Sequence, residues 1–295
     1  MKSLHTEAQG SLFSVAIRGV LFCTLLCISF LISADESRLR FAVGGFYSTS
    51  DSGIEVTSPL TDKTFELDFE SDLKLVESEF LPFFALAYWF NGNHVVYLDW
   101  KRLHRDATNL NVTTPFEYEH PESGDKYLVQ SGSELTTTFN VDIARLGYGY
   151  DFYSDDEWDL LLTAGLHVMW FELGFTGDIA ACVDNNCGTV NPDSEHIVFT
   201  DVTAPLPDIG IVANYRFADG WRLGTQAQYF YLSLDNIRGR LVDLSIGVEY
   251  TLKDSFATEL SYKYYKVSAD IEEDNSTLKL HYGFHGPMLT FSYIF

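Results

Sequence analysis

Hydrophobic and polar side chains alternate with a period of two along most of the chain after residue 35. Residues 158–171, 208–217 and 242–252 show the pattern most clearly, with aliphatic and aromatic residues on one side and small or polar residues on the other. A period of two is typical of β-strands with one apolar face. The sequence therefore predicts an all-β fold.

Ten such segments can be distinguished, separated alternately by short and long connections. The short connections include Asn91-Gly92-Asn93 and Ala218-Asp219-Gly220, which carry the residues that tight turns need. Eight or twelve strands remain open, because a loop could hide a hairpin or a weak strand could be false. The predicted strands lie near residues 38–49, 76–90, 94–106, 135–152, 158–175, 205–217, 221–234, 240–252, 256–269 and 278–295.

Two architectures could produce this alternation. A β-sandwich would turn the apolar sides into a core, whereas a transmembrane barrel would turn them toward lipid and enclose the polar sides. Aromatic residues gather at strand ends, as at Trp158 and Trp170, where interface girdles would lie. The rhythm of short turns and long loops also favours the barrel. We expect a closed antiparallel up-and-down barrel with both ends of the mature chain on one side of the membrane.

Two predicted strands change parity along their length. In 135–152 and in 278–295 the apolar positions move from one side of the strand to the other. A one-residue β-bulge would keep a single lipid-facing side. We therefore expect bulges at Ala144-Arg145 and at Gly286-Pro287.

The first 34 residues have the layout of an export signal. Lys2 and Arg18 precede an apolar run over residues 19–32, and Ala34 provides a small residue at the expected cut. The run is shorter than the ~20 residues that a spanning helix needs. The sequence predicts a signal peptide over 1–34 and a barrel domain over 35–295.

Removal of the signal leaves two cysteines, Cys182 and Cys187, which flank an Asn-Asn turn centre. Export implies an oxidising compartment, so we expect a local disulfide between them. It would contribute about 2 kcal/mol by closing a short loop. Two free thiols are the alternative.

The formal net charge is −23, from 42 acidic and 19 basic residues. Such a chain has no excess of Lys or Arg with which to replace phosphate counterions, which argues against nucleic acid as a partner. Aromatic residues make up 15% of the chain, which suits strands and membrane interfaces. No motif indicates a cofactor.

The last strand ends Met288-Leu-Thr-Phe-Ser-Tyr-Ile-Phe295, with aromatic residues at alternate positions up to the final Phe. This ending resembles the C-terminal signature of bacterial outer-membrane barrels, and the mature chain is similar to the small OmpA- and OmpW-like barrels. The resemblance implies residence in the outer membrane of a Gram-negative bacterium, a monomeric state, and contact with lipid and lipopolysaccharide. It also implies recognition by the barrel-assembly machinery through Phe291, Tyr293 and Phe295.

The polar faces of the strands predict a charged lumen. Buried charges must be paired or hydrated, and ten strands enclose little more space than the eight that side chains just fill. We expect a salt-bridged plug rather than a general diffusion pore, with a porin-like narrow channel or small-ligand conduit as the alternative. The predicted lumen network consists of Arg40, Asp99, Lys101, Arg145, Asp208, Arg216, Arg222, Asp243, Glu249, Glu259, Lys263, His281 and His285.

Two further clusters could carry chemistry. His281 and His285 share a side of the last strand, and a hydrolase acting on lipid or peptide would need such a histidine beside a Ser or Asp partner. The alternating carboxylates Glu66, Asp68, Glu70 and Asp72 offer hard oxygen ligands for a divalent cation, although an acidic run is more often simply solvated. The sequence favours a non-enzymatic barrel with acidic loops for structural or surface-recognition roles, with the conduit and the hydrolase as alternatives.

Overall fold

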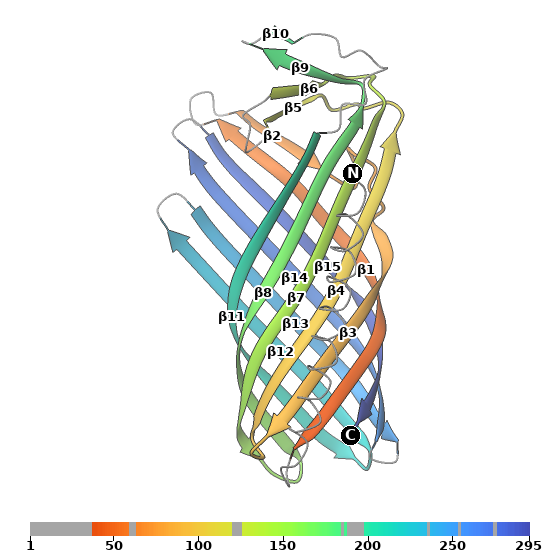
Figure 1. The fold of residues 1–295 in the computed structure, drawn as a ribbon, viewed down its shortest axis with the longest axis vertical. Helices are drawn as coiled ribbons and strands as arrows, with labels where there is room; N and C mark the ends of the chain where they lie inside the picture. Colours follow the sequence, from red (N-terminus) through yellow and green to blue (C-terminus); the bar gives the residue numbers. More distant parts are fainter. Residues whose placement is uncertain are drawn as a thin grey trace, which may run out of the picture.

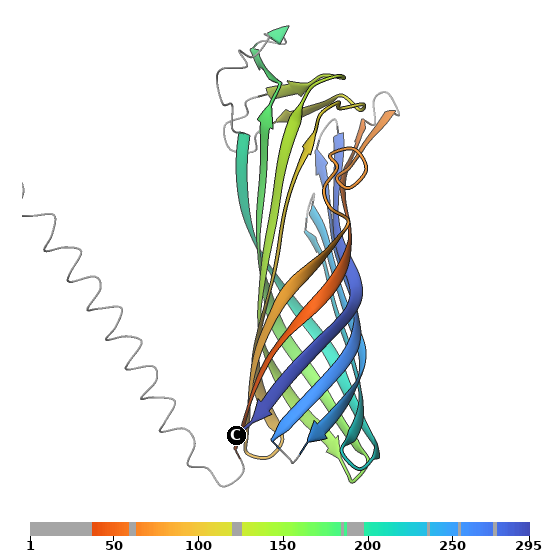
Figure 2. The ribbon, with the colours of Figure 1, turned by 90° about the vertical axis from the view of Figure 1, so that its right-hand side faces the viewer.

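Ten long antiparallel strands close into a tall barrel in the computed structural model, with the last strand paired to the first (Figures 1 and 2). The structure describes residues 37–58, 63–119, 126–183, 186–187, 198–234, 237–252, 255–273 and 276–295. The barrel strands are β1 (Arg38–Ser58), β3 (Ser78–Phe90), β4 (His94–Asn109), β7 (Leu135–Ser154), β8 (Trp158–Gly177), β11 (Val198–Ala218), β12 (Trp221–Leu234), β13 (Ile237–Leu252), β14 (Phe256–Glu273) and β15 (Ser276–Ile294).

The predicted number of strands and the barrel topology are confirmed. Arg40 pairs with Ile294, so β1 begins where β15 ends, at the same end of the barrel as the tight turns. In the first of these turns Asn91 and Gly92 take positive φ values of 52° and 77°. We call this the turn end and the opposite one the loop end. No helix in the described residues is long and apolar enough to cross a membrane.

Short strands extend the loop end. β2 (Lys63–Asp68) forms a hairpin with the upper part of β1. A separate small sheet contains β5 (Phe116–Glu119), β6 (Lys126–Val129), β9 (Ile179–Val183) and β10 (Asn186–Cys187), in the order β10-β9-β6-β5. Several barrel strands also run further toward the loop end than predicted: β1 reaches Ser58 and β11 already begins at Val198.

The outer face changes from apolar to polar along each strand. On β4, Val96 and Leu98 face outward and are each 39% exposed, whereas the outward positions beyond Trp100 are Arg102 and His104. Apolar side chains directed away from the interior over the turn-end half of all ten strands are what a bilayer requires. The strands therefore leave the hydrocarbon region part-way along their length and continue into water. The sandwich alternative is wrong, because these apolar sides are not packed together.

The inner face changes from polar to apolar toward the loop end, opposite to the outer face. The predicted bulges are wrong, because this change accounts for the parity shift without them. β7 pairs with β4 in continuous register through Ala144-Arg145, and β14 pairs with β15 continuously through Gly286-Pro287. On β7 the inward positions are small or polar toward the turn end and become apolar at Ile143, which is buried. Above the membrane, a water-facing outside and an apolar inside reverse the pattern, so the parity change needs no inserted residue.

Candidate functional site in the lumen

Six charged side chains occupy the middle of the lumen. Arg145 on β7 lies 3.7 Å from a carboxylate oxygen of Asp99 and 3.6 Å from one of Asp208. Lys101 lies 3.1 Å from Asp99. Three acids and three bases balance, so these six side chains carry no net formal charge. We call this cluster the charged layer; it consists of Asp99, Lys101, Arg145, Asp208, Asp243 and Lys263.

Side chains from opposite walls meet within this layer. The Tyr265 ring on β14 stacks on His167 of β8 with 5.8 Å between centroids, and its hydroxyl lies 3.3 Å from Nδ1 of that histidine. Lys101 lies 5.5 Å from the centroid of the Tyr265 ring. On the other ring nitrogen, His167 Nε2 is 3.3 Å from Asp208. These contacts connect β4, β8, β11 and β14 across the barrel interior.

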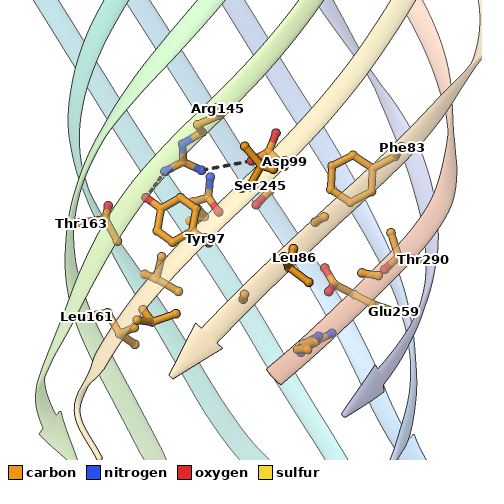
Figure 3. Close-up of a pocket in the computed structure, with 18 of the residues that line it drawn as sticks. Phe83, Leu86, Tyr97, Asp99, Arg145, Leu161, Thr163, Ser245, Glu259 and Thr290 are labelled. Atoms are coloured by element: carbon orange, nitrogen blue, oxygen red, sulfur yellow. Dashed lines mark hydrogen bonds and ion pairs between the residues drawn. The ribbon is translucent and has the colours of Figure 1, made fainter. Parts of the chain in front are cut away.

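A cavity of about 270 Å³ lies in the lumen on the turn-end side of this layer (Figure 3). Arg145, which contacts the Tyr97 hydroxyl, and Asp99 line its upper part. Glu259 and Thr290 line the opposite wall. The cavity is thus a mixed polar and apolar chamber with the charged layer at one end.

Below this chamber, charges pair again. Glu249 on β13 accepts hydrogen bonds from Arg40 and, at 2.7 Å, from Arg222. Arg216 shares the inward face but lies at the rim, where its side chain is 40% exposed and pairs with Asp159 at 2.6 Å. Ten of the predicted lumen residues therefore lie in the interior, and Arg216 lies at the mouth.

Asp155 accepts the hydrogen bonds that hold the adjoining turn between β7 and β8. The Tyr153 hydroxyl, together with the backbone N–H groups of Trp158 and Glu157, holds the pKa of the Asp155 carboxyl below its usual range. Both N–H groups donate to its Oδ1, at 2.7 and 2.8 Å.

An aromatic layer lies on the loop-end side of the charges. Tyr282 on β15 makes edge contacts with Phe139 at 5.8 Å and Phe171 at 5.9 Å, from the facing strands β7 and β8. Phe284 stacks on Tyr265 at 4.8 Å and so joins this layer to the charged one. We use the name aromatic layer for Phe46, Phe139, Phe171, Tyr265, Tyr282 and Phe284.

The connection between β2 and β3 closes the barrel further up. Its Phe69 and Leu73 are buried, and Phe69 packs edge-on against Phe139 with 5.3 Å between centroids. Glu70 accepts hydrogen bonds from the Ser52 backbone N–H at 2.9 Å and from buried Arg105. This segment therefore inserts into the loop end of the lumen, with the Glu70 carboxylate paired to Arg105.

The predicted position of His281 and His285 is wrong. Without a bulge at Gly286-Pro287, both rings lie on the outer face. His285 Nδ1 is 2.8 Å from the Tyr262 hydroxyl, and His281 Nε2 is 3.4 Å from Asp51. They belong to the outer face near and above the apolar belt and are not part of the lumen network.

The four alternating carboxylates do not converge either. Glu66 is exposed on β2, and Glu70 pairs with Arg105. Asp68 and Asp72 instead cap a local turn: Asp72 accepts from the Asp68 backbone N–H at 2.9 Å. Across the described residues, no group of three or more His, Cys, Asp or Glu is arranged to hold a metal ion.

The backbone of β9 and β10 pairs Cys182 directly with Cys187. Directly opposed residues of an antiparallel pair have Cα atoms about 4.5–5.5 Å apart, within the range that a disulfide spans. The two side chains lie outside the described part of the chain, as does the predicted signal peptide over 1–34, so both remain predictions.

Sequence reasoning did not identify several interior residues as part of the site. Tyr265 shares its side of β14 with Lys263 and Glu259, so the alternation placed it in the lumen, but its aromatic ring gave no reason to assign it a role. Tyr97 and Arg105 stand likewise at alternate positions with Asp99 and Lys101.

No known family model matches this chain. No curated protein matches it either. Among solved structures, the outer-membrane protease OmpT of Escherichia coli is similar with a TM-score of 0.56 at 10% identity, over 90% of this chain and 99% of that one. The attachment invasion locus protein Ail of Yersinia pestis covers 88% of this chain and 99% of its own, at 10% identity and a TM-score of 0.34. The toluene transporter TodX of Pseudomonas putida covers 90% and 91%, at 10% identity and a TM-score of 0.32.

The likeness to OmpT shows the fold and leaves the chemistry open, because the identity is low. The outward apolar belt, the closed ladder and the short-turn, long-loop arrangement agree with it. By that fold the chain is a bacterial outer-membrane β-barrel of ten strands, located in the outer membrane of a Gram-negative cell.

Proposed function

We propose that this barrel is non-enzymatic, with a lumen closed to solutes and a loop end that serves structural or surface-recognition roles. The observation that carries the proposal is the charged layer, in which Arg145 pairs with Asp99 and Asp208, together with Tyr265, which reaches across the lumen to His167. A permeable pore needs hydrated, laterally separated charges, whereas most of these side chains are buried and lie within ion-pair distance of one another. The aromatic layer and the inserted segment around Phe69 add two further barriers in series.

Conductance in a planar bilayer tests this proposal. The refolded mature barrel should insert without steady single-channel current, and a general porin reconstituted in the same way controls for insertion and sensitivity. Steady, ohmic current from the parent chain would overturn the closed-lumen proposal.

A narrow conduit for small solutes is the second candidate, and the cavity beside Arg145 and Asp99 is the observation that favours it. Passage would require the charged layer to rearrange. In that case the bilayer recordings would show brief, small openings, and a Tyr265→Ala variant would lengthen them. The histidine pair that suggested the hydrolase alternative does not form a lumen site, because His281 and His285 lie outside the lumen.

The partners follow from the outer surface. Phe291 and Phe295 point away from the barrel and are 53% and 68% exposed, and Tyr293 stands between them. We propose that these rings are available to the barrel-assembly machinery before insertion and to lipid afterwards. The polar outer face above the belt would then meet lipopolysaccharide headgroups.

A further inference from the structure

The barrel wall is incompletely paired between two neighbouring strands. Within the described residues, β11 and β12 pair only from Ile209 with Tyr229 down to the turn. Above that level the Val198–Asp208 part of β11 pairs with β8 alone, and Phe230–Leu234 of β12 pairs with β13 alone. Both ribbon views show these upper ends diverging (Figures 1 and 2). We call the unpaired boundary the seam.

The backbone direction of β11 shows which groups face the seam. The Arg216 N–H donates to the Glu157 carbonyl, on the β8 side, at 2.7 Å. Alternate residues of a strand point their backbone groups to the same side, and the register with β8 is continuous from Val198 to Tyr215. Even-numbered residues therefore face β8 and odd-numbered residues face the seam. Pro205 and Pro207 are odd-numbered, so the seam edge has no N–H at these two positions.

The prolines disfavour closure of the seam. If the register with β12 continued, Pro207 would stand opposite Tyr231 and Pro205 opposite Ser233. Each such pair normally exchanges two hydrogen bonds, but here each could make only one. The same missing donors disfavour addition of a strand from another polypeptide, because prolines on an edge block strand pairing. Where this edge lies at membrane depth, the prolines also leave fewer donors unsatisfied.

The seam lies at the top of the apolar belt and has apolar margins. Thr203 stands opposite Trp170, an outward ring of the belt. Ile209 and Tyr231 are 69% and 52% exposed at its outer margin. On the inward side, Leu206 and Phe230 pack against the apolar interior that includes the aromatic layer.

We infer that the seam is a lateral portal through which an acyl chain of an outer-leaflet amphiphile inserts between β11 and β12. Its depth brings it beside acyl chains, its margins are largely apolar, and above the level of the charged layer the lumen behind it is apolar. Apolar residues predominate at these margins, with Asp201 as an exposed charge near the upper end and Asp208 buried beside Arg145 at the lower end. A strand partner lacks two donors at the prolines. This inference goes beyond the proposed closed lumen and does not depend on it.

Photo-crosslinking tests the portal in the intact mature barrel. The photoreactive amino acid p-benzoylphenylalanine replaces Leu206, and the protein is refolded into phosphatidylcholine vesicles in which a fraction of the lipid carries an alkyne-tagged acyl chain. A matched variant carries the same group at Leu241, which is buried on the fully paired strand β13. Irradiation should attach tagged lipid at position 206 and leave position 241 at background. Heat-modifiable migration verifies that each variant is folded, and Val267 on β14 replaces Leu241 as the control if that variant fails to fold.

A second variant distinguishes a portal from general looseness of the wall. Pro205→Thr/Pro207→Thr restores two N–H donors to the seam edge, so labelling at position 206 should fall toward background as β11 and β12 pair further. Equal labelling at 206 and at the control position, or labelling unchanged by the proline replacements, would overturn the portal. A protein–protein adduct at 206 in place of a lipid adduct would overturn it in favour of a second copy at the seam.

Discussion

Removal of the Arg145 guanidinium should destabilise the barrel more than removal of any charge at its rim. Arg145 lies within 4 Å of Asp99 and Asp208 and also contacts the Tyr97 hydroxyl. In Arg145→Leu the charged layer would keep three acids but only two bases, with Asp208 fully buried. Breaking a buried ion pair by removing one partner costs about 3–5 kcal/mol, because the remaining charge is uncompensated.

Urea unfolding of the barrel in vesicles, followed by tryptophan fluorescence and gel migration, measures this cost. The double variant Arg145→Leu/Asp208→Asn restores the balance of charge, so it should recover part of the lost free energy of unfolding. Arg216→Leu is the matched control: its side chain is 40% exposed beside Asp159, and exposed pairs contribute about 0–1 kcal/mol. The reasoning is refuted if the two single variants lose similar amounts, or if the double variant is less stable than Arg145→Leu.

Three other substitutions test other parts of the architecture. Gly286 has a φ of 153°, and a Cβ there would lie 2.1 Å from a backbone carbonyl oxygen of β1. Gly286→Ala should therefore lower the free energy of unfolding by about 1–3 kcal/mol in the same assay. The control Gly239→Ala places its Cβ in open space and should be neutral. Ile246→Lys places a charge on the lipid face and should lower the free energy of unfolding by about 2–4 kcal/mol. Asp106→Lys changes an outward residue above the belt and should lower it by less than about 1 kcal/mol. Equal losses in the two variants would contradict the placement of the membrane. Phe295→Ala should reduce outer-membrane yield in cells while leaving stability in vesicles nearly unchanged, and an unaltered yield would remove the assembly role.

The strand count was predictable because half of each barrel strand lies in the bilayer, where the alternation is simplest. Between Ile209 and Phe217, or Val242 and Leu252, outward residues face lipid and inward residues, mostly small or polar, face the lumen. Turn residues with restricted backbone preferences, such as Asn91-Gly92, then fixed the boundaries at one end. Both signals are local, so a single sequence contains them.

The loop end could not be predicted for a physical reason. Above the membrane the outside is water, so Asn140 and Asp142 face outward while Phe139 and Val141 pack inside. The pattern reverses without any change in backbone register, and a reversed pattern resembles a bulge or the start of a loop. The bulge misassigned the sides of His281 and His285. Contacts that depend on the barrel closing, such as Tyr265 on His167, have no local signature at all.

The position of the charged layer explains how the seam and the closed lumen are compatible. Leu206, at the inner margin of the seam, stands opposite His167, and His167 stands opposite Arg145 on the next strand. The seam therefore opens at the level of the charged layer and above it, onto the aromatic layer, whereas the mixed polar and apolar cavity lies below. An acyl chain that enters from the side would meet aromatic rings and then a layer of buried ion pairs that it cannot solvate. The same layer that blocks ions from above would thus confine an apolar ligand to the upper lumen. The two proposals can be tested separately, because conductance reports on the charged layer and lipid crosslinking at Leu206 reports on the seam.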